Sequence, residues 1–475
     1  MFAIIGALRG FYSDRNAKVS YTVGRSVRNQ FLSESSSFFV FLTPSLTLLS
    51  ILMIISSVIV AFLLHLYQPP TQDESVFRQI YDECYFPLLK FLKNNKSFSV
   101  TLNMPLSFLE QIDRYGYIDW INNVKELVIS GRVEITGSAA YHPILTKIDQ
   151  NSVLKQIILN EYSLGYYFGE HKGFEGENSL LVRDLNGFFP PELALNSELI
   201  EILDEAGYTW VISEKNGIED STNNAIGSHI YTLGNRNIRI VTRDSFLSNL
   251  VGFKKNQEAN DINEIISKRY KEDDISVIAL DAESFGHHNK EGLYLLSQIV
   301  DYMHNKGIVI KTVNDLISLF TPKMVKEYKE TNWSVVSSDS GKKDLYDLWD
   351  CTSNKIHTIL WKLLKEFEKD LINVDKFSSS DGYEILPIWI NSKLDEIQDK
   401  TIRDNVRDSL LLLKSQNSDQ FWWSSKKLIN EKELFMPSMV FKNILIYKEI
   451  IKNRRIAKLE NFLLESEVKL KELLI

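Results

Sequence analysis

The chain has 475 residues, of which 44% are hydrophobic and 24% charged, so it is a globular protein long enough for two or three domains. Its formal net charge of −8 argues against a dedicated nucleic-acid binder, whose contact surface would be basic. The two cysteines, Cys84 and Cys351, form neither a metal-ligand spacing nor a disulfide framework, and we expect a cytoplasmic, reducing location.

The amino-terminal segment, residues 1–57, is expected to be an extension or a membrane anchor. No charged residue occurs between positions 35 and 64, a length that could cross a bilayer. Its last part is needed as the first strand of the next domain, which leaves residues 38–57, with Pro44 among them. Two interpretations stay open: a membrane anchor formed by 38–57, or an upstream extension outside the working protein, with the natural start near Met53. We favour the extension, because an anchor normally has a linker.

The next segment, residues 58–325, is expected to be an α/β barrel domain. Short apolar runs alternate with helical stretches. Strands are predicted at 58–64, 97–105, 208–213, 275–283 and 308–313. A further strand is predicted to begin at residue 132 and to lead into a loop, and residues 187–191 are predicted to be the end of another. A helix is predicted to begin near Ser197, as its N-cap, and to stop at Gly207; another ends at Gly307. Strands that alternate with helices predict a parallel sheet with crossover connections, and their repetition favours a barrel.

The remaining residues, 326–475, are expected to form a helical C-terminal domain. Six apolar side chains recur at helical spacing and predict one buried helix face: Ile356, Leu360, Leu363, Leu364, Phe367 and Leu371. Further helices are predicted at 406–414 and 439–474.

Polar side chains gather at four predicted strand ends, where parallel α/β proteins place their working residues. These ends are His65 to Pro69, Glu134 to His142, Pro190 to Glu192, and Asp281 to His288. Each has an ordinary structural interpretation by itself: a hydrogen-bonded histidine, a solvated Pro-Pro-Glu turn, or an aspartate that caps a helix. Four of them at strand ends favour a functional site.

The motifs HLYQPP, GRVEITGSAAYHPIL, GFFPPELALNSELIEILDEAGYTWVISE and ALDAESFGHH resemble, in order, the sequence regions of glycoside hydrolase family 57. The resemblance covers 58 to about 320, and the later DQFWWSSKK, residues 419–427, resembles the helical part of less-characterised members. It implies a (β/α)7 barrel followed by a C-terminal helical bundle, and retaining, cofactor-free action on an α-glucan or maltooligosaccharide through a covalent glycosyl-enzyme. It also implies that Glu192 is the nucleophile and Asp281 the acid/base.

Retaining hydrolysis needs two carboxyl groups about 5 Å apart across the sugar. We expect Glu192 to be ionised, and Asp281 to keep its proton because burial and the nearby Glu192 charge raise its pKa. Glu283 lies two residues further along and shares the strand face if the strand continues that far. It is either a substrate-binding carboxylate or, in a different register, the acid/base itself.

Further substrate contacts are predicted around these acids. His65, Gln68, His142 and His287 are expected to hydrogen-bond sugar hydroxyls, with a structural role favoured for His288. Arg243 and Asp244 are either substrate contacts or a surface ion pair. Trp422 and Trp423 either stack on a sugar ring or pack between helices.

Phe188 and Phe189 stand where better-studied members of the family often carry Trp, and the Pro-Pro-Glu form resembles the amylase-like branch. Hydrolase, 4-α-glucanotransferase and branching enzyme therefore stay open. A metal-dependent polysaccharide deacetylase is disfavoured, because the sequence lacks the His-x-x-x-His spacing of its metal site, and we expect no metal. A non-catalytic glycan-binding protein is disfavoured because both motif carboxylates are present.

Overall fold

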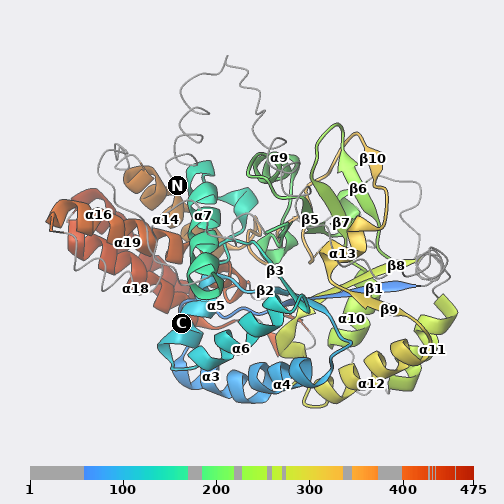
Figure 1. Ribbon diagram of the computed structural model, residues 1–475. Helices are drawn as coiled ribbons and strands as arrows, with labels where there is room; N and C mark the ends of the chain where they lie inside the picture. Colours follow the sequence, from blue (N-terminus) through green and yellow to red (C-terminus); the bar gives the residue numbers. More distant parts are fainter. Residues whose placement is uncertain are drawn as a thin grey trace. The chain divides into compact units, whose positions relative to one another are not determined.

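The computed structural model describes residues 58–169, 185–218, 227–253, 259–269, 274–334, 345–372, 398–425, 428–429, 432–433, 435–454 and 456–474, all within one unit of the chain (Figure 1). The predicted extension or anchor, 1–57, lies outside the described residues. In the described part, no helix combines the length and apolar character that a membrane crossing requires.

The first sheet has the strand order β3-β2-β1-β8, with every pair parallel. These strands are β1 Ile59–His65, β2 Val100–Asn103, β3 Val133–Thr136 and β8 Ile275–Asp281, and β9 Val309–Lys311 pairs with the first half of β1. All of β1 is buried, and its alternate side chains Val60, Phe62 and Leu64 belong to the main hydrophobic core. The other face of β1 ends in His65.

The second sheet has the order β10-β6-β7-β5-β4 and is parallel except for the pair β6/β7. Its strands are β4 Gly187–Phe188, β5 Trp210–Ser213, β6 Ile230–Leu233, β7 Arg239–Thr242 and β10 Lys323–Val325. A parallel bridge between Gly137 and Phe188 joins the end of β3 to β4. The amide of Asp244, just after β7, donates to the carbonyl of Val277 in β8 at 2.9 Å. The carboxyl end of β3 thereby meets β4, and the carboxyl end of β7 meets the middle of β8.

Helices follow the strands, as the alternating pattern predicted, and cover the sheets (Figure 1). They are α3 Glu74–Ile80, α4 Phe86–Asn94, α5 Leu106–Arg114, α6 Ile118–Ile129, α7 Gln150–Phe168, α9 Ser197–Glu205, α10 Ser245–Phe253, α11 Ala259–Arg269, α12 Gly292–Asn305 and α13 Val313–Ser318. A π-helical turn, η1 Tyr81–Tyr85, joins α3 to α4. The predicted cap of α9 is one residue off: Asn196, not Ser197, accepts the amide of Leu199. Gly207 and Gly307 follow α9 and α12 with positive φ, as helix-ending glycines do.

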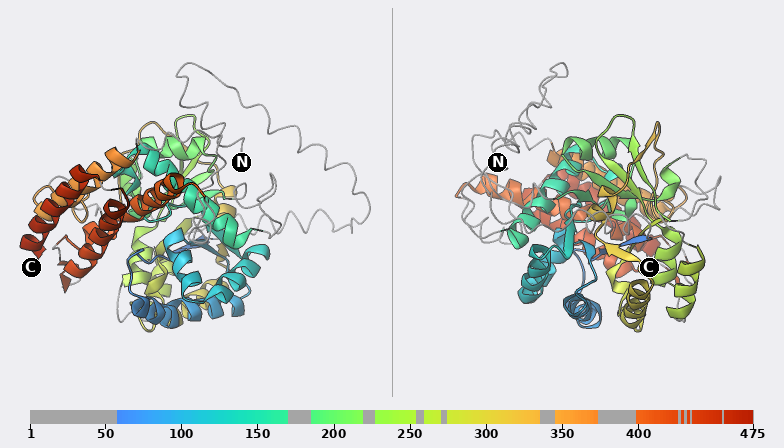
Figure 2. Two further views of the ribbon diagram at one scale, coloured as in Figure 1. Left: turned by 90° about the vertical axis from the view of Figure 1, so that its left-hand side faces the viewer. Right: turned by 45° about the vertical axis from the view of Figure 1, so that its right-hand side comes forward.

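The C-terminal helices pack around a second hydrophobic cluster (Figure 2). They are α14 Lys355–Ile372, α16 Lys400–Ser415, α17 Asp419–Trp422, α18 Pro437–Arg454 and α19 Ala457–Leu474, with a short hairpin of β11 Leu428–Ile429 and β12 Lys432–Glu433. The six apolar residues predicted on one face of α14 are all buried in this cluster, which confirms that prediction. The single run predicted at 439–474 is instead two helices, α18 and α19.

Candidate active site

The carboxyl ends of the first sheet bring polar side chains into one row. His65 is in register with Asn103 of β2 and with Asp281 of β8, and Asn103 is in register with Thr136 of β3. Asn103 Oδ1 accepts from His65 Nδ1–H at 2.7 Å, and Asn103 Nδ2 donates to Thr136 Oγ1 at 2.9 Å. The buried strands therefore end in a hydrogen-bonded polar edge, where the sequence predicted a site.

Glu192 lies in the 3-10 turn η3, Pro191–Leu193, directly after β4. Its φ of 58° is in the left-handed region, a conformation that costs a non-glycine residue about 1 kcal/mol or more and that surrounding contacts must hold. Both carboxylate oxygens are engaged: Ser418 Oγ donates to Oε1 at 2.7 Å, and Trp333 Nε1 donates to Oε2 at 2.8 Å. The side chain is thus fixed by two donors that come from later parts of the chain.

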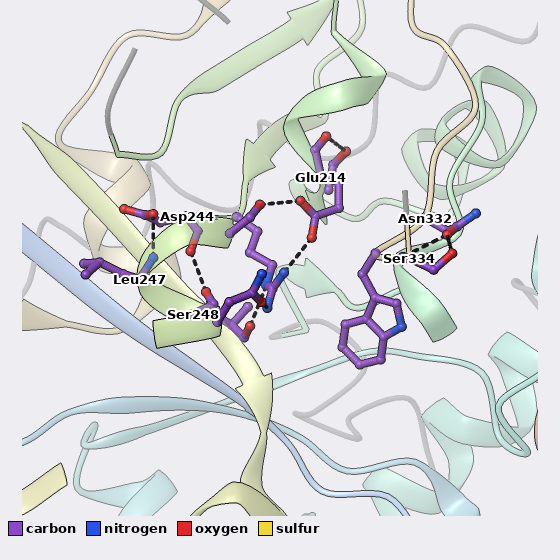
Figure 3. Close-up of polar contacts among 12 residues, drawn as sticks. Glu214, Asp244, Leu247, Ser248, Asn332 and Ser334 are labelled. Atoms are coloured by element: carbon purple, nitrogen blue, oxygen red, sulfur yellow. Dashed lines mark hydrogen bonds and ion pairs between the residues drawn. The ribbon is translucent and has the colours of Figure 1, made fainter. Parts of the chain in front are cut away.

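The segment that carries Trp333 is itself anchored. Thr331 forms an antiparallel bridge with Leu195, and the amide of Trp333 donates to the carbonyl of Glu192 at 3.1 Å. On either side of the indole, the side chain of Asn332 accepts the amide and the hydroxyl of Ser334 (Figure 3). This closed turn fixes the direction in which the indole N–H points.

A stack of aromatic rings lines the same region. The ring of His142 lies 4.0 Å from that of Tyr67 and 4.9 Å from that of His65, which stacks on Phe189 at 4.6 Å. Burial lowers the pKa of His65 to about 4 and the pKa of His142 well below its usual value, so both rings are neutral at pH 7. The Nε2 atoms of both histidines are buried without a partner among the described residues. Each is a candidate contact for a ligand hydroxyl.

The C-terminal region supplies Ser418 and Asp419 to the site. Asp419 begins α17, and the hydroxyl of Tyr67 donates to its Oδ2. Burial raises the pKa of Asp419 to about 6, and the Asp281 charge acts in the same direction. Ser418 lies 3.1 Å from His142 Nδ1, and its amide donates to the carbonyl of His142.

Asp281 and Glu283 belong to different elements of the structure. The strand ends at Asp281, and Glu283 belongs to the 3-10 turn η5, Ala282–Ser284, so the expected shared strand face is wrong. Glu283 Oε1 accepts from the hydroxyl of Tyr85 in η1 and, at 3.3 Å, from Gln68 Nε2. Glu283 is buried among these partners, whereas Asp281 is partly exposed.

Burial dominates the electrostatics of this carboxyl group cluster, which we define as Glu192, Asp281, Glu283 and Asp419. It raises the pKa of Asp281 to about 6 against the opposing charge of Arg243, which is the expected direction, but burial and not the expected charge of Glu192 is the cause. It also raises the pKa of Glu192 to about 8, although the hydrogen bonds from Ser418 and Trp333 oppose the change. The expectation of an ionised Glu192 at pH 7 is therefore corrected: burial and the charges of Asp419 and Asp281 favour its protonated form.

Arg243 and Asp244 form neither a surface pair nor an open contact. The buried guanidinium of Arg243 donates to Glu214 Oε1 and to the carbonyl of Ala279, each at 2.7 Å, and to Asn249 Oδ1 at 2.9 Å. Asp244 accepts the amide of Leu247 at the start of α10 and the hydroxyl of Ser276. Figure 3 shows the contacts of Glu214 and Asp244. Arg243 thus acts on Asp281 through its charge.

The remaining residues that were predicted to contact the substrate differ in how deeply they are buried. Gln68 is buried between Tyr85 and Gln72, with which it exchanges hydrogen bonds of 2.9 and 3.0 Å. His287 is half-buried and pairs with Glu83 at 2.6 Å. Trp423 is buried in the second hydrophobic cluster, and Trp422 is partly buried against it. Contacts of these residues with a sugar stay predictions.

Sequence reasoning missed several residues that hold the site: Asn103, Tyr85, Trp333, Ser418 and, as a site residue, Asp419. Asp419 belongs to the motif DQFWWSSKK. No sequence motif marks Trp333 or Ser418, because only the fold brings them to Glu192. In the ranges that the structure describes, no three or more His, Cys, Asp or Glu side chains are arranged to hold a metal ion.

Comparison with known proteins identifies the family of this chain. The profile of "Glycosyl hydrolase family 57" matches residues 48–329. A 4-alpha-glucanotransferase of Thermococcus litoralis is 22% identical over 436 residues, 85% of this chain and 58% of that protein. An alpha-amylase of Pyrococcus furiosus is 28% identical over 154 residues, 32% of this chain and 21% of that protein. The chain thus spans little more than half of the first relative and a fifth of the second.

Solved structures show the same fold at low sequence identity. A branching enzyme from Pyrococcus horikoshii, described as of the family 57 type, superimposes with a TM-score of 0.62 at 15% identity, over 88% of this chain and 93% of that one. The family profile alone covers more than half of the chain, with Glu192 and Asp281 inside the matched range. The protein described above is therefore a member of glycosyl hydrolase family 57.

Proposed function

We propose that the protein is a retaining, α-glucan-active glycoside hydrolase that acts through a covalent glycosyl-enzyme, with 4-α-glucanotransferase or branching activity as the alternatives on the same scaffold. The scaffold is a (β/α)7 barrel over 58–325 followed by a helical domain over 326–475. One observation carries the proposal: Glu192, held by two donors, lies 3.7 Å from Nδ1 of His142. The ring of His142 stacks on that of His65, which is in register with Asp281 at the end of β8. Double displacement requires two carboxyl groups across the sugar, and this row of contacts leads from one acid to the other.

The proposed reaction has two steps. In the first, a carboxylate oxygen of Glu192 bonds to the anomeric carbon while the bond to the leaving oxygen breaks, and Asp281 gives that oxygen its proton. In the second, Asp281 takes a proton from water or from a sugar hydroxyl, whose oxygen bonds to the anomeric carbon and releases Glu192. Hydrolysis and transfer differ only in this acceptor.

Asp281 is preferred over Glu283 as the acid/base. Tyr85 and Gln68 already donate to Oε1 of Glu283, and burial encloses that side chain. Asp281, which is partly exposed, lies in register with His65, whose Nε2 has no partner in the part of the chain that the structure describes. This arrangement favours Asp281 as the carboxyl group that faces the substrate and gives Glu283 a supporting role.

The pKa values of the pair define its working pH range. Burial and the charge of Asp281 raise the pKa of Glu283 to about 8, so Glu283 keeps its proton at pH 7. Glu192, with a pKa of about 8, and Asp281, with a pKa of about 6, then hold one proton between them, mostly on Glu192. In the reactive form that proton is on Asp281 and Glu192 is ionised. The positive charge that develops on the sugar in the transition state favours this form. We expect kcat/KM to be bell-shaped with limbs near pH 6 and 8, because the pair has two protons below this range and none above it.

The test is incubation with maltoheptaose, followed by analysis of the products. Glucose and short chains indicate hydrolysis, a ladder of longer chains indicates 4-α-glucanotransfer, and new branch points indicate branching. Glu192→Gln should abolish turnover and leave maltoheptaose binding intact. Unchanged turnover in this variant would remove the proposal.

A further inference from the structure

Ser418, directly before α17, donates to one carboxylate oxygen of Glu192, and Trp333 donates to the other. The serine hydroxyl reaches Oε1 at 2.7 Å, and the serine side chain is completely buried. An antiparallel bridge between Pro143 and Asn417, which includes the 3.0 Å hydrogen bond from the amide of Ser418 to the carbonyl of His142, anchors it to the loop after β3. The hydroxyl is thus held by backbone contacts on the barrel side of the molecule.

The same hydroxyl is 3.1 Å from His142 Nδ1, which lies 3.7 Å from Glu192 Oε1. When Glu192 is ionised, the serine proton must point at the carboxylate, because a carboxylate only accepts. The serine oxygen then accepts from His142 Nδ1–H. The three groups form one directed chain of hydrogen bonds, from His142 to Ser418 to Glu192.

We propose that Ser418 is a positioning residue that orients Glu192 and stabilises its ionised, attacking form through this chain; the inference rests on the proposed function of Glu192. Trp333 holds the other oxygen, so loss of Ser418 leaves one donor in place of two. The chain also directs the Nε2 lone pair of His142, which has no partner among the described residues, toward a ligand donor.

The groups that face Glu192 set its pKa, and a change in that pKa is what reports the role of Ser418. Asp281 comes from β8, Asp419 from α17, Tyr67 from the loop after β1 and His142 from the loop after β3. The two acids oppose ionisation of Glu192, whereas Ser418 and Trp333 favour it. Removal of the serine hydroxyl therefore raises the pKa of Glu192, while Asp281 keeps its own surroundings.

In Ser418→Ala, the proton shared by Glu192 and Asp281 moves further onto Glu192. A hydrogen bond to a charged group corresponds to a change of about one pH unit or more. We expect the plateau of kcat/KM on maltoheptaose to fall about tenfold or more, and the alkaline limb to move to higher pH by about one unit. The acid limb, set by Asp281, should stay within a few tenths of a unit.

Two further variants make the test specific. Ser418→Thr restores a hydroxyl and should recover most of the plateau and the position of the alkaline limb. Ser424→Ala is the matched control: Ser424 is a buried serine of the same segment whose hydroxyl donates to the carbonyl of Phe421, and its loss should leave both limbs in place. Ser418→Cys, with a thiol as a weaker donor, should give an intermediate shift and serves if the alanine variant does not fold.

The outcomes separate the inference from the proposed function. Alkaline limbs that coincide in the wild type, Ser418→Ala and Ser418→Cys overturn the inference, even when the plateau falls. An equal limb shift in Ser424→Ala also overturns it. Retained turnover in Glu192→Gln instead overturns the proposed function and leaves no nucleophile to orient.

Discussion

At the scale of single residues, the structure separates two acids that stand two positions apart. Asp281 ends a strand and is partly exposed, whereas Glu283 is buried under Tyr85 and Gln68. We predict that Asp281→Asn lowers kcat on maltoheptaose by about 10²- to 10⁴-fold, because the leaving oxygen loses its proton donor. The loss should be much smaller for α-maltosyl fluoride, whose fluoride leaves without a proton. Kinetics on both substrates measure the difference, and a Glu283→Gln variant that shows the larger selective loss would exchange the two roles.

At the scale of elements, the segment 331–334 holds Glu192 through two hydrogen bonds, one to its carboxylate and one to its carbonyl. We predict that Trp333→Phe, which keeps the ring but removes the N–H donor, lowers kcat/KM by about tenfold, as loss of a hydrogen bond to a charged group does. Trp361→Phe is the matched control, because the indole of Trp361 donates to the carbonyl of Trp349 and not to Glu192. Equal loss of kcat/KM in both variants would show that the effect is general destabilisation.

The elements also show how far sequence patterns reach. Strand ends such as His65 and Asp281 were predictable, because parallel strands place their carboxyl ends at one edge and the motifs mark them. Trp333 and Ser418 were not, since their partner Glu192 is more than a hundred positions away and nothing in their neighbours indicates it. Asp281 and Glu283 do not share a strand face, because the strand ends at Asp281 and the chain turns directly after it.

At the scale of the whole molecule, the carboxyl group cluster links stability to pH. Burial raises the pKa of Glu192 from 4.5 to about 8, so between these values the folded protein holds a proton that the unfolded chain has lost. This contribution is fully present below pH 4.5 and is lost as the pH rises to 8. At about 1.4 kcal/mol per pKa unit the full contribution is roughly 5 kcal/mol, and at pH 7 about 1.4 kcal/mol of it remains.

We therefore predict that the unfolding temperature of the wild type falls between pH 5 and 8 more steeply than that of Glu192→Gln, which carries no proton to lose. Thermal unfolding followed by circular dichroism at several pH values measures both slopes. Glu465→Gln, which changes an exposed glutamate of α19, should leave the slope unchanged. Parallel curves for wild type and Glu192→Gln would contradict the assigned burial of this carboxyl group.

The most direct measurement of the central claim is the site of covalent glycosylation. A 5-fluoro-α-glucosyl fluoride transfers its glycosyl group to the nucleophile, with loss of fluoride, and its ring fluorine slows the second step so that the ester accumulates. Proteolysis and mass spectrometry should locate the added mass on Glu192, and Glu192→Gln should remain unlabelled. A label on Asp281, Glu283 or Asp419, or turnover of the reagent by Glu192→Gln, would contradict the account.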